Sequence, residues 1–346
     1  MKCNYILLIL LIVFSFSDAK SEIYTTTDGH KFEVSLIPDK HSILQNEPLY
    51  FSLEVKNLSE TPIAFAHGGD NRNEFGRPNS FKVYVVGSDK KVIDKFPTRM
   101  NMGGGIGPIK ILPNEKQTIR FLLAQWIKFE KPDNYIVFCE KDIAIAKYDK
   151  NSSISELLKA PSVKIKVDFQ ILVKPNNPKE MAQIIDSFGK SIFSPIYFKR
   201  SEAFKALRFV NDKLVIKYLV EAVKKDLVND KNYEHFRYDI FQMLSKFDDK
   251  NAFNAIVKKI NSPDTEIRRY VSIALSSSPY SKAEKYLLSM QTDSSDPIRL
   301  DVVHYLGRKK SKKSTEILKT MINDSSSYVR GEARRYLTER GEKYEN

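Results

Sequence analysis

Cysteine is scarce in this sequence of 346 residues, which holds only Cys3 and Cys139. Cys3 lies in an N-terminal segment that we expect to be removed, so the remaining chain has one cysteine and cannot form an internal disulfide. A single cysteine in an exported chain can pair with a second chain. However, residues 135–139 have the composition of a buried strand, which favours Cys139 as a small buried hydrophobe.

The sequence also lacks the residue patterns of common enzymes. Neither His-x-x-x-His nor Gly-x-Ser-x-Gly occurs, and no close pair of carboxylates stands beside a histidine. The five histidines are scattered: His30, His41, His67, His235 and His304. We therefore expect no catalytic residues, no metal ligands and no cofactor, and a protein that is not an enzyme.

Glycine is concentrated in one stretch, residues 102–107, which lacks the surroundings of a phosphate site. Such a site needs a helix that opens directly after the loop, whereas Pro108 leads into a strand-like segment. His67 and Asp70 stand close together in another loop, but the spacing supplies no third and fourth metal ligand. We expect neither loop to be a ligand site.

Long apolar runs are absent apart from residues 6–16, which follow Lys2 and precede Ser17, Asp18 and Ala19. This arrangement predicts a secretory signal peptide, residues 1–19, cleaved after Ala19. The alternative, an uncleaved membrane anchor, is disfavoured because spanning a bilayer takes about 20 residues. We expect an exported protein, periplasmic or extracellular, without a transmembrane segment after signal removal.

Acidic residues are outnumbered by basic ones. The formal net charge is +13, and residues 176–346 supply most of it, with 32 Lys and Arg against 23 Asp and Glu. A basic exported surface favours an acidic protein, an anionic envelope polymer or lipid headgroups as its partner, and we expect no nucleic acid. The alternative is that the charge serves solubility alone.

The first half of the sequence shows the alternation of half-buried strands. Apolar and polar residues alternate in about eight short segments with no helical interval between them. The segments are residues 32–36, 49–55, 63–65, 81–85, 91–93, 119–123, 135–139 and 163–173. This pattern predicts an antiparallel sandwich of two sheets over residues 20–174.

Within this half, the phrase Tyr50-Phe-Ser-Leu-Glu-Val-Lys-Asn57 and the late segment with Asn114, Trp126 and Asn134-Tyr-Ile-Val137 carry a resemblance. They resemble bacterial immunoglobulin-like modules, in which the late segment forms the last strands and a tyrosine corner. The antibody-type cysteine pair is missing. The resemblance implies an immunoglobulin-like fold with Trp126 as a core anchor.

Residues 175–179 predict a short linker, with Asn177 as helix N-cap and Pro178 in the first helical position. Helical periodicity then runs from residue 180 to residue 346. The apolar-Arg phrases Ile267-Arg268, Ile298-Arg299 and Val329-Arg330 recur every 31 residues, and a period of about 20–50 residues is typical of solenoids. The fold class is therefore two-domain, all-β followed by all-α, with an α-solenoid of about 4–5 repeats.

These phrases, each preceded by an aspartate, resemble HEAT-like repeats of the short type named after phycobilin lyases. The resemblance implies a ladder of Asp and Arg residues that links neighbouring units. In this sequence the ladder positions are Arg237, Arg268, Arg299, Arg330, Asp264, Asp296 and Asp324. A guanidinium can bridge helix ends in a way that an ammonium cannot, so we expect a structural role for these arginines.

Lysines recur on the second helix of successive units, and second helices usually line the concave face of a solenoid. The proposed partner-binding set is Lys258, Lys259, Lys282, Lys285, Lys309, Lys310, Lys312 and Lys313. The functional hypothesis is a non-enzymatic binding scaffold for a protein or acidic partner. The alternatives are an inhibitor or adhesin that acts through sandwich loops, and an enzyme accessory subunit or lyase-like enzyme.

Overall fold

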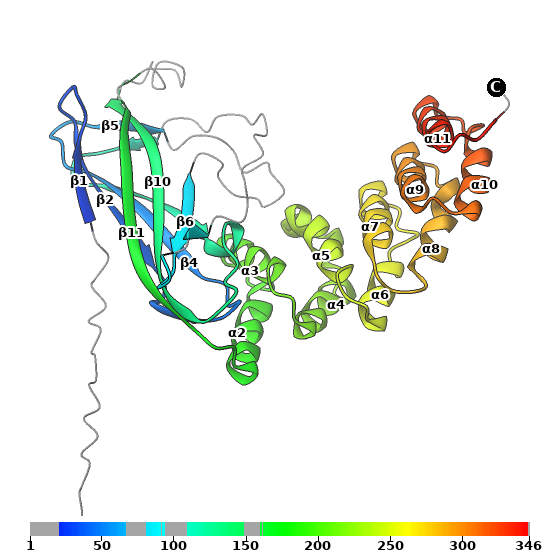
Figure 1. Cartoon of the computed structure of the whole chain (residues 1–346), viewed down its shortest axis with the longest axis horizontal. Coiled ribbons are helices and arrows are strands. Elements are labelled where there is room, and N and C mark those ends of the chain that lie inside the picture. Colours follow the sequence, from blue (N-terminus) through cyan, green and yellow to red (C-terminus); the bar gives the residue numbers. More distant parts are fainter. Residues whose placement is uncertain are drawn as a thin grey trace, which may run out of the picture. The chain divides into compact units, whose positions relative to one another are not determined.

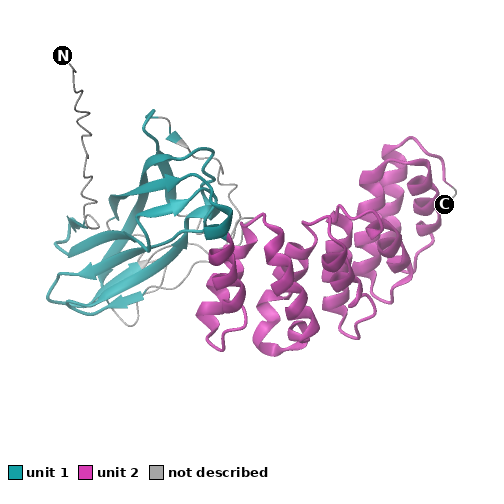
Figure 2. Cartoon of the chain, turned by 90° about the horizontal axis from the view of Figure 1, so that it is seen from below, with its two compact units in different colours: residues 1–181 teal, residues 182–346 magenta. Residues whose placement is uncertain are grey.

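The computed structural model describes residues 21–66, 81–90, 92–93, 109–148, 160 and 162–344 (Figure 1). The predicted signal peptide, the pair His67 and Asp70, and the glycine-rich stretch 102–107 lie outside these residues. The chain divides into two compact units, residues 1–181 and 182–346 (Figure 2). Within the described ranges, no helix has the length and hydrophobicity that crossing a bilayer demands.

The first unit contains two sheets. In the described residues, one sheet has four antiparallel strands in the order β1, β2, β4, β9. Their bounds are β1 (Ser21–Thr25), β2 (Lys31–Pro38), β4 (Tyr50–Asn57) and β9 (Lys116–Leu122). Burial alternates along β2 as the sequence pattern predicts, with Phe32, Val34 and Leu36 fully buried.

The second sheet is organised around one long strand. Over the same described part of the chain it has seven strands: β3 (Ser42–Leu44), β11 (Ser162–Lys174), β10 (Asp133–Lys147), β5 (Ile63–Ala66) and β8 (Ile109–Ile111) in this order, with β6 (Lys82–Val86) also paired to β10 and β7 (Val92–Ile93) paired to β6. One edge of β10 pairs with β11 and the other pairs first with β6 and then with β5.

Side chains from both sheets form one hydrophobic core, which includes Phe32 of β2 and Val137 of β10. Trp126, directly after the short helix η1 (Leu123–Gln125), is 2% exposed and meets Phe121 edge to face. Burial raises the pKa of the Cys139 thiol to about 12. The predictions of a β-rich first half, a core tryptophan and a buried cysteine are confirmed.

Two turns are held by specific residues. The Tyr135 hydroxyl donates to the Lys131 carbonyl, 3.0 Å away and four residues upstream. The buried Asn57 side chain donates to the carbonyls of Thr61 and Ile111 and accepts from the Ser59 N–H. These bonds satisfy polar groups that would otherwise be costly to bury.

The second half of the chain is helical, as predicted. The helices are α2 (Pro178–Ser191), α3 (Tyr197–Arg208), α4 (Ile216–Lys224), α5 (Arg237–Leu244), α6 (Lys250–Val257), α7 (Thr265–Ser277), α8 (Ala283–Ser289), α9 (Asp296–Lys309), α10 (Lys312–Met321) and α11 (Ser327–Glu339), with short 3₁₀ turns η2 (Lys213–Val215), η3 (Leu227–Asn229), η4 (Lys231–Phe236) and η5 (Met290–Thr292). Asn177 accepts from the N–H groups of Lys179 and Glu180 at the start of α2, which makes it the cap.

The helices of the second unit form two rows. Figure 1 shows α5, α7, α9 and α11 following one another on the inner side of the curve of this unit, and α4, α6, α8 and α10 on the outer side. The expectation that second helices line the concave face is therefore wrong for this chain. The first helices pack directly on one another along this inner side, α5 on α7, α7 on α9 and α9 on α11.

A lysine-rimmed groove as candidate functional site

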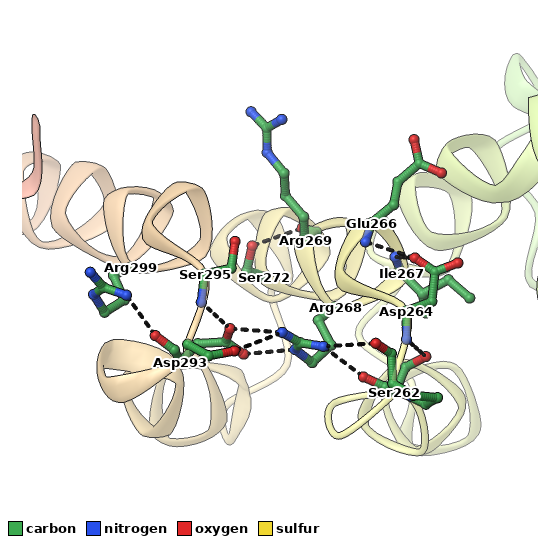
Figure 3. Close-up of polar contacts among 12 residues, drawn as sticks. Ser262, Asp264, Glu266, Ile267, Arg268, Arg269, Ser272, Asp293, Ser295 and Arg299 are labelled. Atoms are coloured by element: carbon green, nitrogen blue, oxygen red, sulfur yellow. Dashed lines mark hydrogen bonds and ion pairs between the residues drawn. The ribbon is translucent and has the colours of Figure 1, made fainter. Parts of the chain in front are cut away.

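Two arginines of the repeat phrases, Arg268 and Arg299, link consecutive helical units through two-pronged contacts, and Figure 3 shows that of Arg268. Arg268 Nε and Nη2 donate to the two carboxylate oxygens of Asp293 at 2.8 and 3.0 Å. Arg299 repeats this arrangement with Asp324, at 2.8 Å for both bonds. Each guanidinium also donates to backbone carbonyls of the preceding turn, so one side chain joins three chain segments.

These pairs are largely buried, with 10–12% of each side chain exposed. The hydrogen bonds from Arg268 and Arg299 hold the pKa of Asp293 and Asp324 below the usual range of a carboxyl. The same bonds raise the pKa of both guanidinium groups. The charged forms are therefore the stable ones, which suits a structural pair.

The predicted ladder positions Arg237 and Asp264 also pair between units, whereas Arg330 and Asp296 hold no rung among the described residues. Arg237 contacts Asp264 at 3.3 Å and Glu266 at 3.2 Å, whereas Arg330 donates to the carbonyls of Asp324 and Ser325.

Asp296 does not hold the rung to Arg299, and its carboxylate instead accepts from the Ser326 hydroxyl. Asp293 bonds the arginine of the preceding unit, because it lies three residues earlier, where the turn approaches Arg268.

Arg200 occupies the corresponding place in the first unit, but its hydrogen-bond partners are of a different kind. It donates to the carbonyls of Ser194, Pro195 and Asn232. The Asn232 carbonyl belongs to η4, in the segment that lengthens this interval relative to the 31-residue period. Among the described residues, Arg200 therefore bonds the next unit through a carbonyl and not through a carboxylate.

A groove of about 750 Å³ lies between the neighbouring helices α4 and α6. Its apolar lining consists of Ile216, Val220, Val223 and Ala255. The helical spacing of residues 216, 220 and 223 places these three on one face of α4. The Asp249 side chain caps the start of α6 at the groove, where it accepts hydrogen bonds from the backbone N–H groups of Asn251 and Ala252.

The rim of the groove is basic. Lysines approach from α4 and its η2 turn and from the end of α6, namely Lys213, Lys217, Lys224 and Lys258. The two acids of the lining are already engaged, since Asp249 caps α6 and Glu221 lies 3.6 Å from Lys225. Within the described part of the chain, the side chains of Lys213, Lys224 and Lys258 form no ion pair or hydrogen bond, although the charge of Lys258 contributes to lowering the pKa of Asp226. These ammonium groups can therefore bind a ligand.

The lysines proposed from the sequence are not gathered into one site. Lys258 lines the groove, whereas the neighbouring Lys259 is paired with Asp226. Lys309 lies 3.8 Å from Glu284 at the end of α9. The others are exposed on or beside helices α8, α9 and α10: Lys282, Lys285, Lys310, Lys312 and Lys313.

Three groove lysines were missed at the level of sequence. Lys213, Lys217 and Lys224 follow one another at intervals of four and seven residues, which places them along one face of a helix. That spacing was available as a signal. The contribution of Lys258 from the opposite wall depends on the packing of α4 against α6.

The groove combines a basic rim with an apolar floor. Its lining contains no histidine, cysteine or serine. Among the described residues, no group of three or more His, Cys, Asp and Glu could hold a metal ion. The arrangement suits the binding of an anionic ligand with an apolar portion.

The helical unit resembles a known repeat family. Residues 253–338 match the family model of HEAT repeats. The match runs from the middle of α6 into the last turn of α11 and includes the rungs of Arg268 and Arg299, and it confirms the helical-repeat prediction for this part of the chain. HEAT repeats are often protein-interaction scaffolds. No curated protein matches the chain.

Solved structures align to parts of the chain with low scores. Two engineered proteins from a structural genomics consortium share 19% identity with it; they cover 49% and 46% of this chain and 85% and 48% of their own, with TM-scores of 0.30 and 0.29. The PapD-like domain of human CEP192 shares 10% identity, covering 41% of this chain and 87% of that domain, with a TM-score of 0.22.

Proposed function

We propose that the protein is a non-enzymatic binding scaffold and that the groove between α4 and α6 receives an acidic segment of a protein partner. The observation that carries the proposal is the position of Lys213, Lys224 and Lys258 around an apolar floor. An acidic partner would supply the carboxylates that these lysines lack among the described residues. The match of residues 253–338 to HEAT repeats supports a binding role.

An acidic peptide fits this groove better than an extended anionic polymer surface. Lysines stand on both walls, so a ligand that contacts all of them lies between the helices. Aliphatic portions of the ligand would cover the floor. The exposed amides of Asn251 and Asn254 on α6 can each donate and accept, as the backbone of a peptide requires.

We propose an immunoglobulin-like sandwich in the first unit, supported by the bond from Tyr135 to the Lys131 carbonyl, which has the form of a tyrosine corner. We propose a HEAT-type solenoid of about 4–5 repeats in the second, and export directed by residues 1–19.

The test compares two charge-reversal variants of the full mature chain. One carries Lys213→Glu, Lys224→Glu and Lys258→Glu. The matched control carries Lys282→Glu, Lys285→Glu and Lys312→Glu, three exposed lysines of the same unit outside the groove. Binding of a fluorescently labelled, glutamate-rich peptide is followed by anisotropy at low and high salt.

We expect the groove variant to bind the peptide at least tenfold more weakly than the control variant, because three direct charge contacts become repulsive. Equal weakening in both variants would contradict the proposal, since it would reflect net charge alone. If a chain lacking residues 180–346 still bound the peptide, the result would instead favour an inhibitor or adhesin that acts through the sandwich.

A further inference from the structure

The groove between α4 and α6 has two unlike ends. Asp226, two residues beyond α4, is paired with Lys259, two residues beyond α6. The last turns of both helices therefore lie at the same end of the groove. Because α4 and α6 also pack on each other in the outer row (Figure 1), they run in the same direction, and their first turns form the opposite end.

The end formed by the last turns carries two ammonium groups that form no hydrogen bond or ion pair among the described residues. Lys224 belongs to the last turn of α4, and Lys258 is the C-cap residue of α6. Asp226 at this end is already engaged, since it accepts from Lys259 and from the Asn229 amide. Each helix terminus adds roughly half a negative charge, which a full ammonium charge outweighs.

The opposite end is less basic and already holds an anion. Helix N-termini attract negative charge, but at α6 the Asp249 carboxylate takes that place and accepts from the first N–H groups of the helix. Of the lysines on the α4 side, Lys217 lies 3.6 Å from Asp186 of α2. An incoming carboxylate would therefore meet one unpaired ammonium here, that of Lys213, and two at the other end.

The apolar floor lies between the two ends. Ile216, Val220 and Val223 extend over about 10 Å of α4, at a rise of about 1.5 Å per residue. An extended chain covers this length in about three residues, at roughly 3.3 Å each. A ligand that covers the floor and places its charge at one end therefore needs its apolar and acidic residues in separate, adjacent blocks.

We propose that the groove selects partner segments in which about three apolar residues adjoin a block of acidic residues, with the acidic block at Lys224 and Lys258. This inference rests on the proposed function and adds the pattern and register of the bound segment. With two carboxylates in one block, each meets one of these two ammonium groups. A carboxylate moved to the other end would approach the negative charge of Asp249.

The test compares three end-capped, fluorescently labelled peptides of identical composition by anisotropy on the full mature chain. Two of them carry a block of two glutamates, before or after Leu-Val-Leu, and the third carries one glutamate on each side. The variant Lys224→Gln with Lys258→Gln removes the two proposed contacts. The matched control, Lys213→Gln with Lys217→Gln, removes the same number of charges at the opposite end of the groove.

We expect the tighter-binding block peptide to exceed the split peptide in affinity by about tenfold, because its second carboxylate gains an ammonium partner and avoids Asp249. Lys224→Gln with Lys258→Gln should abolish this preference. Lys213→Gln with Lys217→Gln should leave it unchanged within about twofold.

Equal affinities for the three peptides would overturn the inference, and if binding were still lost in the triple charge-reversal variant of the groove, the proposed function would stand. Loss of the preference in the control pair alone would also contradict the inference, because the acidic block would then lie at the opposite end. If neither pair of substitutions nor the triple reversal changed binding, the groove would not be the site, and both proposals would fail.

Discussion

Arg299 in the helical unit and Lys141 in the sheet unit are equally buried, each with 8% of its surface exposed. Their surroundings differ completely. Arg299 donates to both oxygens of Asp324 and to the Asp293 carbonyl. Lys141 faces the Phe81 ring and, among the described residues, has no acceptor.

This difference shows how the surroundings of a buried cation decide its role. The planar guanidinium directs several donors at once, so carboxylate and carbonyl groups of different units can offset the cost of desolvation. A compact ammonium next to an aromatic ring recovers only part of that cost. Arg299 remains charged and joins units, whereas Lys141 loses its proton more readily.

Removing the carboxylate from the arginine pair should have the largest effect. We expect Asp324→Ala to lower the free energy of unfolding of the helical unit by about 3–4 kcal/mol, because Arg299 would remain buried without its counter-charge. Urea unfolding followed by far-ultraviolet circular dichroism measures the change.

Asp296→Ala is the matched control, because Asp296 is exposed and bonds only the Ser326 hydroxyl among the described residues. Its effect should stay below about 1 kcal/mol. Equal losses of unfolding free energy in the two variants would show that the ion pair with Arg299 stabilises the unit no more than the exposed Asp296 carboxylate does.

Removing the unpaired amine should have the opposite sign. Lys141→Met is expected to raise the free energy of unfolding of the sheet unit by up to about 3 kcal/mol at pH 7, the equivalent of the difference between a pKa near 8 and that of an ordinary lysine. Unfolding followed by the fluorescence of Trp126 reports on this unit.

The lowered pKa of Lys141 also predicts that the stability of the sheet unit depends on pH. Below pH 8 both the folded and the unfolded chain hold the proton, so the burial penalty is fully present. Between about pH 8 and the pKa of an ordinary lysine the unfolded chain binds more protons, and stability should rise with pH. In Lys141→Met this rise should be absent, and a rise of the same size in the variant would assign it to other groups.

A change of shape at constant charge should have the smallest effect. Arg268→Lys keeps the positive charge but loses the two-pronged contact with Asp293, and we expect a loss of about 1–2 kcal/mol. Arg269→Lys, at the adjacent and half-exposed position, should stay within about 0.5 kcal/mol. Indistinguishable unfolding midpoints for the two variants would show that the stability from the pair comes from its charge alone and not from the two-pronged geometry of the guanidinium.

Much of the fold followed from periodicity. Alternation over residues 32–36 and 49–55 predicted half-buried strands, and the 31-residue period located the arginines of the helical units. The identity of the bonded carboxylate did not follow, because the turn before α9 offers both Asp293 and Asp296, and the path of the chain selects between them. Sequence spacing alone does not define that path.

The groove and Lys141 were less accessible to prediction, for different reasons. The groove needs two helices that are distant in sequence to pack together, although the spacing of Lys213, Lys217 and Lys224 was visible. Lys141 was visible in principle, since it continues the inward series of Val137 and Cys139 along β10. An inward lysine interrupts the hydrophobic pattern, so the predicted strand stopped at residue 139.

The bonds made by Arg200 bear on the order in which the helices come apart. The contacts of Arg268 and Arg299 tie α7, α9 and α11 into one cooperative block, in which the loss of one unit weakens its neighbour. Arg200 reaches the next unit through the Asn232 carbonyl and the Tyr233 ring, and among the described residues it has no carboxylate partner there. The Arg–Asp pair across the same boundary, Arg208 with Asp239, is longer than the rungs further on, at 3.9 Å. We therefore expect the array to divide first between α3 and α5, so that amide protons of α3 exchange before those of α7 and α9.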